Sequence, residues 1–371
     1  VYNFRTERYI RCESLLFDPR PKTCKKDLYN FNDELNSLIK FFSKSLTIVT
    51  GLRRTGKTSL VLTALEESAM PYIYIDLREG VSSYRDLYIV ISKSFERFAS
   101  KFSKRDILWS YIVKGLKSIK GVSIAGFEIS FSWGRDRVLL TELFEVLDNA
   151  AERANTKIVV VFDEVQKIRG SISEILYSSI AHSYDFHRNI SFVLTGSEMG
   201  LLYNVVMNPK SPLYGRVFME VKTRRLNAEE SRDFLLTGFR EVNMHVSFNE
   251  IDLVVDELDG IIGWLTYYGY LKINGVENLE TIKKTAIEMA KTEIENFLRF
   301  RVSKRYRVVL KLLAKGYREW GLLKKELEKY EGREISDRVL HDILKTLKIY
   351  SIIDENNNFL DPIIKDAVAE L

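Results

Sequence analysis

Short apolar runs alternate with amphipathic segments through the first 220 residues of the chain. Five runs have the length and composition of buried strands, at 46–51, 71–77, 157–164, 190–197 and 216–222. Segments with apolar residues at helical spacing lie between them, among them 83–102, 106–117 and 171–184. Residues 122–133 fit either a small hairpin or an irregular strand. Because buried strands that are joined by helices pair in parallel, the pattern predicts a three-layer α/β domain over residues 18–222.

The pattern changes after residue 222. Residues 227–300 show helical periodicity alone, broken at 259–270, which predicts a helical lid domain over 223–300. The remaining residues predict helices at 304–315, 321–330 and 336–348, followed by a hairpin in "YSIIDENNNFLD" (350–361). Three helices followed by a two-stranded wing are the order of a winged helix-turn-helix, so we predict this domain over 301–371. Residues 1–17 are predicted to form an N-terminal tail.

The composition indicates in which environment the protein works, and it says little about which reaction the protein catalyses. The chain is 46% hydrophobic and 29% charged, and its formal net charge of +5 permits contact with nucleic acid without arguing for it. No apolar run is long enough to cross a bilayer, and no signal-peptide core opens the chain. Cys12 and Cys24 lack a matching set of Cys or His residues, so neither a disulfide framework nor a zinc site is expected. We therefore predict a cytoplasmic protein in a reducing environment.

Residues 51–58, "GLRRTGKT", fit the phosphate-binding pattern G-x-x-x-x-G-K-[ST] at every fixed position. The stretch follows a buried strand and opens a helix, where unpaired amides and the helix dipole favour an anion. Lys57 is predicted to reach the β- and γ-phosphates, and Thr58 to bind Mg²⁺. The alternative is an ordinary strand-to-helix turn. The predicted nucleotide-binding residues of this loop are Gly51, Arg53, Arg54, Thr55, Gly56, Lys57, Thr58 and Ser59.

A phosphate-binding loop of this kind also needs a metal-holding acid at the end of another core strand. The stretch "IVVVFDEVQ" (158–166) supplies it, because a buried strand there ends in two acids. Asp163 is placed to hold Mg²⁺, and Glu164 to polarise the attacking water as the catalytic base. A nucleotide binder that does not hydrolyse has no need of the glutamate, so the pair predicts hydrolysis.

Three further groups are candidates for contacts with the phosphates. Thr195 and Ser197, in "VLTGSE", occupy a sensor position after the next strand, with helix capping as the alternative. Arg216, in "SPLYGR", is predicted to stabilise charge on the phosphoryl oxygens, from its own or a neighbouring subunit, against the alternative of a surface salt bridge. Arg53 and Arg54 allow the same role, although arginines at such positions more often pair with acids beneath the loop.

With these motifs in place, the sequence resembles the archaeal ATPase family, a branch of the STAND-type signalling ATPases related to AAA+ proteins. The stretches that carry the resemblance are "GLRRTGKTSL", "VVVFDEVQ", "VLTGSEMGLL", "SPLYGR", "LDGIIGWL" and the N-terminal "FDPRPKTCKKDLYNFNDELNSL". The chain departs from the family at Ile262, where a proline is usual, and at Asn30 and Asn32, where the family's acidic motif carries an arginine.

The resemblance implies ATP hydrolysis coupled to a conformational switch, with the nucleotide between the α/β core and the lid. It also makes Trp264 a candidate to cover the base or sugar, with a buried core tryptophan as the alternative. ATP rather than GTP is implied by the resemblance alone.

The C-terminal domain carries weak signals for DNA. Its positive charge gathers on the first helix, in "RVSKRYRVVLKLLAKGYR" (301–318), while the wing is acidic. We therefore favour docking to a protein partner or to another copy of the chain over sequence-specific DNA binding. Two alternatives to an ATPase switch stay open: a DNA-associated regulator or mobile-element factor with ATP as an allosteric ligand, and a nucleotide kinase or other transferase.

Overall fold

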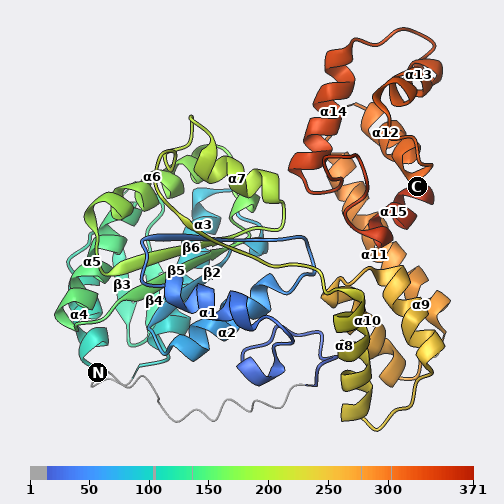
Figure 1. The fold of residues 1–371 in the computed structure, drawn as a ribbon. Coiled ribbons are helices and arrows are strands. Elements are labelled where there is room, and N and C mark those ends of the chain that lie inside the picture. Colours follow the sequence, from blue (N-terminus) through green and yellow to red (C-terminus); the bar gives the residue numbers. More distant parts are fainter. Residues whose placement is uncertain (1–14, 103–105, 136, 277, 302) are drawn as a thin grey trace.

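The computed structural model describes residues 15–102, 106–135, 137–276, 278–301 and 303–371, and the first half of the chain is a three-layer α/β domain (Figure 1). The five predicted strands are confirmed, as β1 (Leu46–Thr50), β2 (Tyr72–Asp76), β5 (Ile158–Asp163), β6 (Ile190–Thr195) and β7 (Met219–Lys222). They form one sheet in the order β2-β5-β6-β1-β7, and every neighbouring pair is parallel.

Both faces of the sheet are covered by helices, which explains why every residue of the central strands is buried and most of them are apolar. Along β5, Val159 and Val161 pack against α1 (Asn32–Phe41) and α2 (Lys57–Ser68). Val160 and Phe162 point to the other face, which is covered by α3 (Tyr84–Ala99), α5 (Leu140–Arg153) and α6 (Ser171–Phe186). Because the strands are parallel, the residues that follow β1, β5 and β6 meet at one edge of the sheet.

The ambiguous stretch 122–133 forms a hairpin of β3 (Val122–Ala125) and β4 (Glu128–Phe131). It packs on α3, while α4 (Ile107–Leu116) packs on α5. Helix α7 (Met199–Met207), directly after β6, was not predicted from the sequence pattern.

The predicted lid consists of helices α8 (Ala228–Glu241), α9 (Phe248–Leu258), α10 (Ile262–Ile273) and α11 (Leu279–Arg299). The predicted break at 259–270 is wrong for most of its length, because α10 begins at Ile262 and only three residues separate it from α9. Leu16 and Phe17, assigned to the tail, are buried in the lid core, and a Cβ at Gly238 or Gly269 would lie 2.4 Å from the Phe17 ring. Residues 1–14 lie outside the described residues.

The three helices predicted for the C-terminal domain are present, as α12 (Arg305–Ala314), α13 (Trp320–Glu331) and α14 (Asp337–Ile349). The predicted wing hairpin is reduced to a single bridge, between Ile353 and Phe359. The sequence interpretation missed α15 (Pro362–Ala369), which returns to pack along α11 and shares one apolar core with the lid (Figure 1). The lid and the winged helix are therefore packed together rather than joined by a free linker.

The structure bears on two further features, the cysteines and the length of the apolar helices. Cys24 is disulfide-bonded, so the prediction of no disulfide is wrong for this residue, and Cys12 lies outside the described residues. Pairing depends on proximity in the folded chain, which spacing in the sequence does not reveal. Among the described residues, no helix has both the length and the apolar character needed to cross a membrane.

The turn between α9 and α10 supports a prediction about stability. Gly260 has φ of +66°, and a Cβ there would lie 1.9 Å from the Leu226 carbonyl oxygen, on the segment that joins the core to the lid. We expect Gly260→Ala to lower the free energy of unfolding by about 3 kcal/mol or more, because neither backbone can move without disturbing the other. Urea denaturation measures the loss. Gly275→Ala is the matched control, since Gly275 also has positive φ but no atom within 4 Å of its Cβ position. An equal loss in both variants would contradict the argument.

Candidate nucleotide-binding site

The loop between β1 and α2 has the backbone geometry that its glycines predict. Gly51 has φ of +143°, and a Cβ there would lie 2.0 Å from the Thr223 hydroxyl oxygen, so a side chain does not fit. Gly56 is left-handed, with φ of +85°, and precedes the first residue of α2. The first turn of α2 therefore presents its free amides toward the space that the loop encloses.

Lys57 is buried inside this loop. Its ammonium group donates to the carbonyl oxygens of Gly51, at 2.9 Å, and Leu52, at 2.5 Å. Burial lowers the pKa of Lys57 to about 8, although the nearby charges of Glu164 and Asp163 oppose this shift. The two acids therefore lie close enough to the loop to act on its lysine, as the motif requires.

Two hydroxyls of the motif hold the loop in place. The Thr55 hydroxyl donates to the Leu52 carbonyl at 2.7 Å and lies 2.6 Å from the Thr223 hydroxyl. The Ser59 hydroxyl accepts from the Lys22 amide at 3.1 Å, which ties the N-terminal segment to α2. Their side chains thus stabilise the loop. Thr58 also lines the pocket, and its hydroxyl has no hydrogen-bond partner within the described chain.

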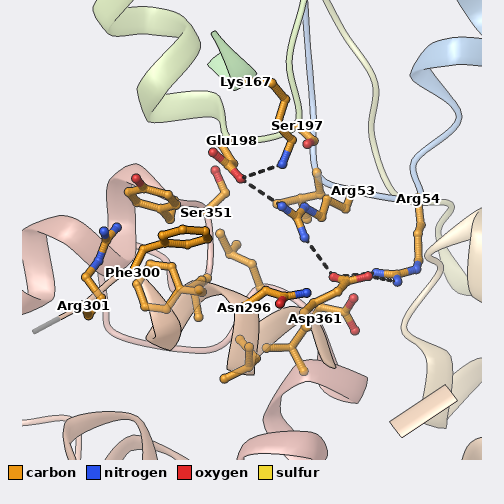
Figure 2. A pocket seen from close by; sticks show the side chains of 18 of the residues that line it. Arg53, Arg54, Lys167, Ser197, Glu198, Asn296, Phe300, Arg301, Ser351 and Asp361 are labelled. Atoms are coloured by element: carbon orange, nitrogen blue, oxygen red, sulfur yellow. Dashed lines mark hydrogen bonds and ion pairs between the residues drawn. The ribbon is translucent and has the colours of Figure 1, made fainter. Parts of the chain in front are cut away.

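Arg53 and Arg54 pair with acids, the alternative given above. Arg53 contacts Glu198 at 2.9 Å and Glu293 at 3.0 Å, and Arg54 also pairs with Glu293, on α11 (Figure 2). Burial tends to raise the pKa of Glu293, but the two arginines outweigh it and hold that pKa below its usual value. The phosphate loop is therefore bonded directly to the lid.

Asp163 lies at the end of β5 with both carboxylate oxygens hydrogen-bonded. Tyr74, on β2, donates to Oδ2 at 2.5 Å, and Thr195, at the end of β6, donates to Oδ1. Burial raises the pKa of Asp163 in spite of these donors, and the nearest cation, Arg78, is 3.7 Å away. The site thus has an oxygen ligand that favours an additional cation.

Glu164 has a left-handed backbone, with φ of +57°, a strained conformation of the kind that gathers at functional sites. Its amide donates to the Thr195 hydroxyl at 3.0 Å, and its carboxylate accepts from Ser197 at 2.8 Å and from Gln166. The two predicted sensor hydroxyls, of Thr195 and Ser197, therefore hold the acids in position.

A cavity of about 580 Å³ lies between the loop, Glu164, the N-terminal segment and α10, and Asp163 is buried behind it without lining it. Its lining includes Lys57, Thr58, Glu164, Trp264 and Arg78. Arg78 was missed from the sequence. The available signal was its position directly after the strand at 71–77, which pairs in parallel with β5 and ends at the same edge of the sheet. Trp264 is only 2% exposed and donates from its indole nitrogen to Asp361 at 3.0 Å, so its observed surroundings are those of a core tryptophan.

Arg216 does not line this cavity. Its guanidinium group pairs with Asp185 at 2.5 Å and donates to the Pro212 carbonyl, which is the surface bridge given as the alternative. Within one copy of the chain, Arg216 is therefore outside the site.

A second, smaller cavity of about 250 Å³ lies where the core, the lid and the winged helix meet (Figure 2). Its lining includes Arg53 and Glu198 of the core, Glu293 of the lid, and Ser351 and Asp361 of the C-terminal domain. The Met199 amide donates to the Ser351 hydroxyl at 2.9 Å, so the segment after β6 is bonded to the winged helix.

Comparison with known protein families identifies two parts of the chain. The profile of an ATPase domain predominantly from Archaea matches residues 30–267, and that of the MCM protein C-terminal winged helix-turn-helix domain matches residues 301–359. The chain is similar to the Walker-type ATPase PABY2304 of Pyrococcus abyssi, at 32% identity over 95% of this chain and 99% of that chain, with a TM-score of 0.76. It shares its fold with the Aeropyrum pernix ORC2 protein in its ADPNP–ADP complexes, at 14% identity over 96% of this chain and 95% of that chain, with a TM-score of 0.63. None of the curated proteins compared with the chain matched it.

The family profile covers more than half of the chain, and its range contains the phosphate loop, both acids and the lid tryptophan. The chain therefore belongs to the archaeal ATPase family, and it is a nucleotide-binding, ATP-hydrolysing P-loop protein that ends in a winged-helix domain.

Proposed function

We propose that the protein is a molecular switch of the STAND type, in which ATP hydrolysis rearranges the lid and the winged helix. The observation that carries this proposal is the bonding of Arg53 and Arg54, inside the phosphate loop, to Glu293 on the lid helix α11. If the loop changes its conformation when ATP is hydrolysed to ADP, these ion pairs would transmit the change directly to α11.

ATP would bind with its phosphates in the 51–58 loop and its nucleoside toward the N-terminal segment and α10, which form the remaining walls of the cavity. Mg²⁺ would be held by the Thr58 hydroxyl and by Asp163, both oxygen ligands of the kind this ion prefers. Among the described residues no cluster of three or more His, Cys, Asp or Glu could hold a metal. The ion would neutralise charge on the phosphates when bound.

Glu164 would act as the base that orients and polarises the attacking water. Ser197 and Gln166 hold its carboxylate, and Thr195 fixes its backbone, so the group enters the reaction already oriented. Lys57 would bind the β- and γ-phosphates, whose charge would compensate its desolvation.

ATP hydrolysis can move the lid only if the γ-phosphate makes different contacts in two arrangements of the molecule. Because α15 packs along α11, movement of the lid would carry the winged helix with it. The contact between Met199 and Ser351 would then be made in one state and lost in the other.

Hydrogen exchange tests this coupling. We expect the amides of residues 197–202 and 348–353 to differ in protection between the ADP-bound chain and the chain bound to a slowly hydrolysed ATP analogue. The buried strand β5 is the internal control and should not change. Identical exchange of these two segments in both nucleotide states would contradict the switch and would leave the assignment of ATPase activity untouched.

Arg216 would contribute to turnover only from a neighbouring copy of the chain, because its own copy holds it outside the cavity. We expect Arg216→Ala to leave nucleotide affinity within about twofold of wild type and to lower turnover about tenfold or more. Mixing Arg216→Ala chains with Lys57→Ala chains should restore part of the phosphate release. No restoration would assign Arg216 to its bridge with Asp185 alone.

A further inference from the structure

A groove of about 680 Å³ separates the end of α11 from the start of α12. Four basic residues line it: Arg299, Arg301, Lys304 and Arg307. Glu295 is the single acid among the described residues of its lining. The groove shares no lining residue with the nucleotide cavity and is not used by the ATPase chemistry.

The basic side chains of this groove are not neutralised by the protein. Within the described chain, Arg299 and Lys304 are exposed and form no ion pair, and Arg307 reaches only the Leu371 main-chain oxygen, at 3.5 Å. The Arg301 guanidinium group lies 4.6 Å from the ring centres of both Phe297 and Tyr350, again without a carboxylate. The next arginine along α12, Arg305, differs, because it is paired with Glu331.

Helix α14, the third helix of the winged-helix domain, has the opposite character. Its exposed Arg338 lies 3.8 Å from Asp342, and Lys348 pairs with Glu355 of the acidic wing at 3.1 Å. Two of its three Lys and Arg side chains, Arg338 and Lys348, therefore already face an acid, and Lys345 is the exception. In the α11–α12 groove, by contrast, none of the four basic side chains is paired with an acid within the described chain.

We propose that the α11–α12 groove binds the phosphodiester backbone of a nucleic acid, without regard to sequence. Arginines and lysines that are exposed and unpaired supply the counterion-releasing contacts on which such binding depends. Guanidinium groups also match phosphate oxygens in geometry. Tyr330 is 68% exposed at the groove and adds a ring on which an unpaired base can stack.

The groove also adjoins the smaller cavity at which the core, the lid and the winged helix meet. Arg301 lines both this groove and the smaller cavity of Figure 2, whose lining also includes Arg53 of the phosphate loop. A backbone phosphate bound at Arg301 would therefore contact a residue that also lines the cavity between the core, the lid and the winged helix.

The test uses the full-length chain and a short labelled oligonucleotide of mixed sequence, single-stranded and duplex, with fluorescence anisotropy across a salt titration. Arg299→Gln/Lys304→Gln is expected to weaken binding about tenfold or more and to lower the salt slope by about 1.5, because two phosphate contacts are lost. Arg338→Gln/Lys345→Gln removes the same charge from α14 and is expected to change affinity less than about threefold. A far-UV circular dichroism spectrum and a Tm that match those of the wild-type chain show that both variants are folded.

Three results would overturn the proposal. The first is no binding of either oligonucleotide form by the wild-type chain at low salt. The second is an equal or larger loss from the α14 pair, which would place binding on the third helix or on diffuse charge. The third is binding of polyglutamate at the groove without binding of the oligonucleotide, which would indicate an acidic protein partner. Failure of ATP hydrolysis would leave this test unaffected.

Discussion

Glu164→Gln is expected to lower steady-state ATP turnover at least about 100-fold, the usual contribution of a positioned general base. The substitution keeps the size of the side chain and its hydrogen bonding to Ser197, but the amide has no basic oxygen with which to polarise water. Nucleotide affinity should stay within about threefold of wild type, because binding relies on the loop rather than on this carboxylate. Phosphate release measures turnover, and titration with ADP measures affinity.

A matched control separates this effect from a change in charge or folding. Glu152→Gln removes one negative charge from an exposed position on α5 and should not change turnover. If Glu164→Gln hydrolysed ATP at a rate within about threefold of wild type, the assignment of the base would be wrong.

Lys57→Ala is expected to weaken ADP and ATP binding about 100-fold or more, because it removes a charge-assisted contact to the phosphates from a desolvated site. Stabilisation of the chain by added nucleotide, measured as the rise in Tm, should disappear. Lys57→Met keeps the buried aliphatic stem without the charge and should behave like the alanine variant, which excludes a cavity as the cause.

Lys167→Ala is the control within the same cavity. Lys167 lines that cavity too, but it lies 3.8 Å from Glu198 and on another element, so its loss should weaken binding less than about tenfold. Equal effects at the two lysines would mean that general positive charge, rather than the loop, binds the nucleotide.

The sheet and the loop were predictable because local rules and tertiary structure agree there. The run 158–162 is apolar throughout, and only a strand with helices on both faces buries every residue of it. The glycine at position 51 follows the same logic, since the close approach of Thr223 leaves no space for a side chain.

The sequence left alternatives open where partners come from distant parts of the chain. Trp264 is held by Asp361, and Arg53 and Arg54 by Glu293, contacts that no local pattern encodes. Helix α15 was missed because the wing was expected to be the last element, although Asp361 followed by Pro362 is a recognisable helix start. Arg78 was overlooked because strand β2 lacks a motif of its own.

Calorimetric titration of the wild-type chain with Mg-ADP and with a slowly hydrolysed Mg-ATP analogue tests the central claim most directly. The account predicts saturable heat with one nucleotide bound per chain, which Lys57→Ala abolishes. Absence of heat from the wild-type chain, or heat that is unchanged in Lys57→Ala, would contradict the placement of the phosphates in the 51–58 loop.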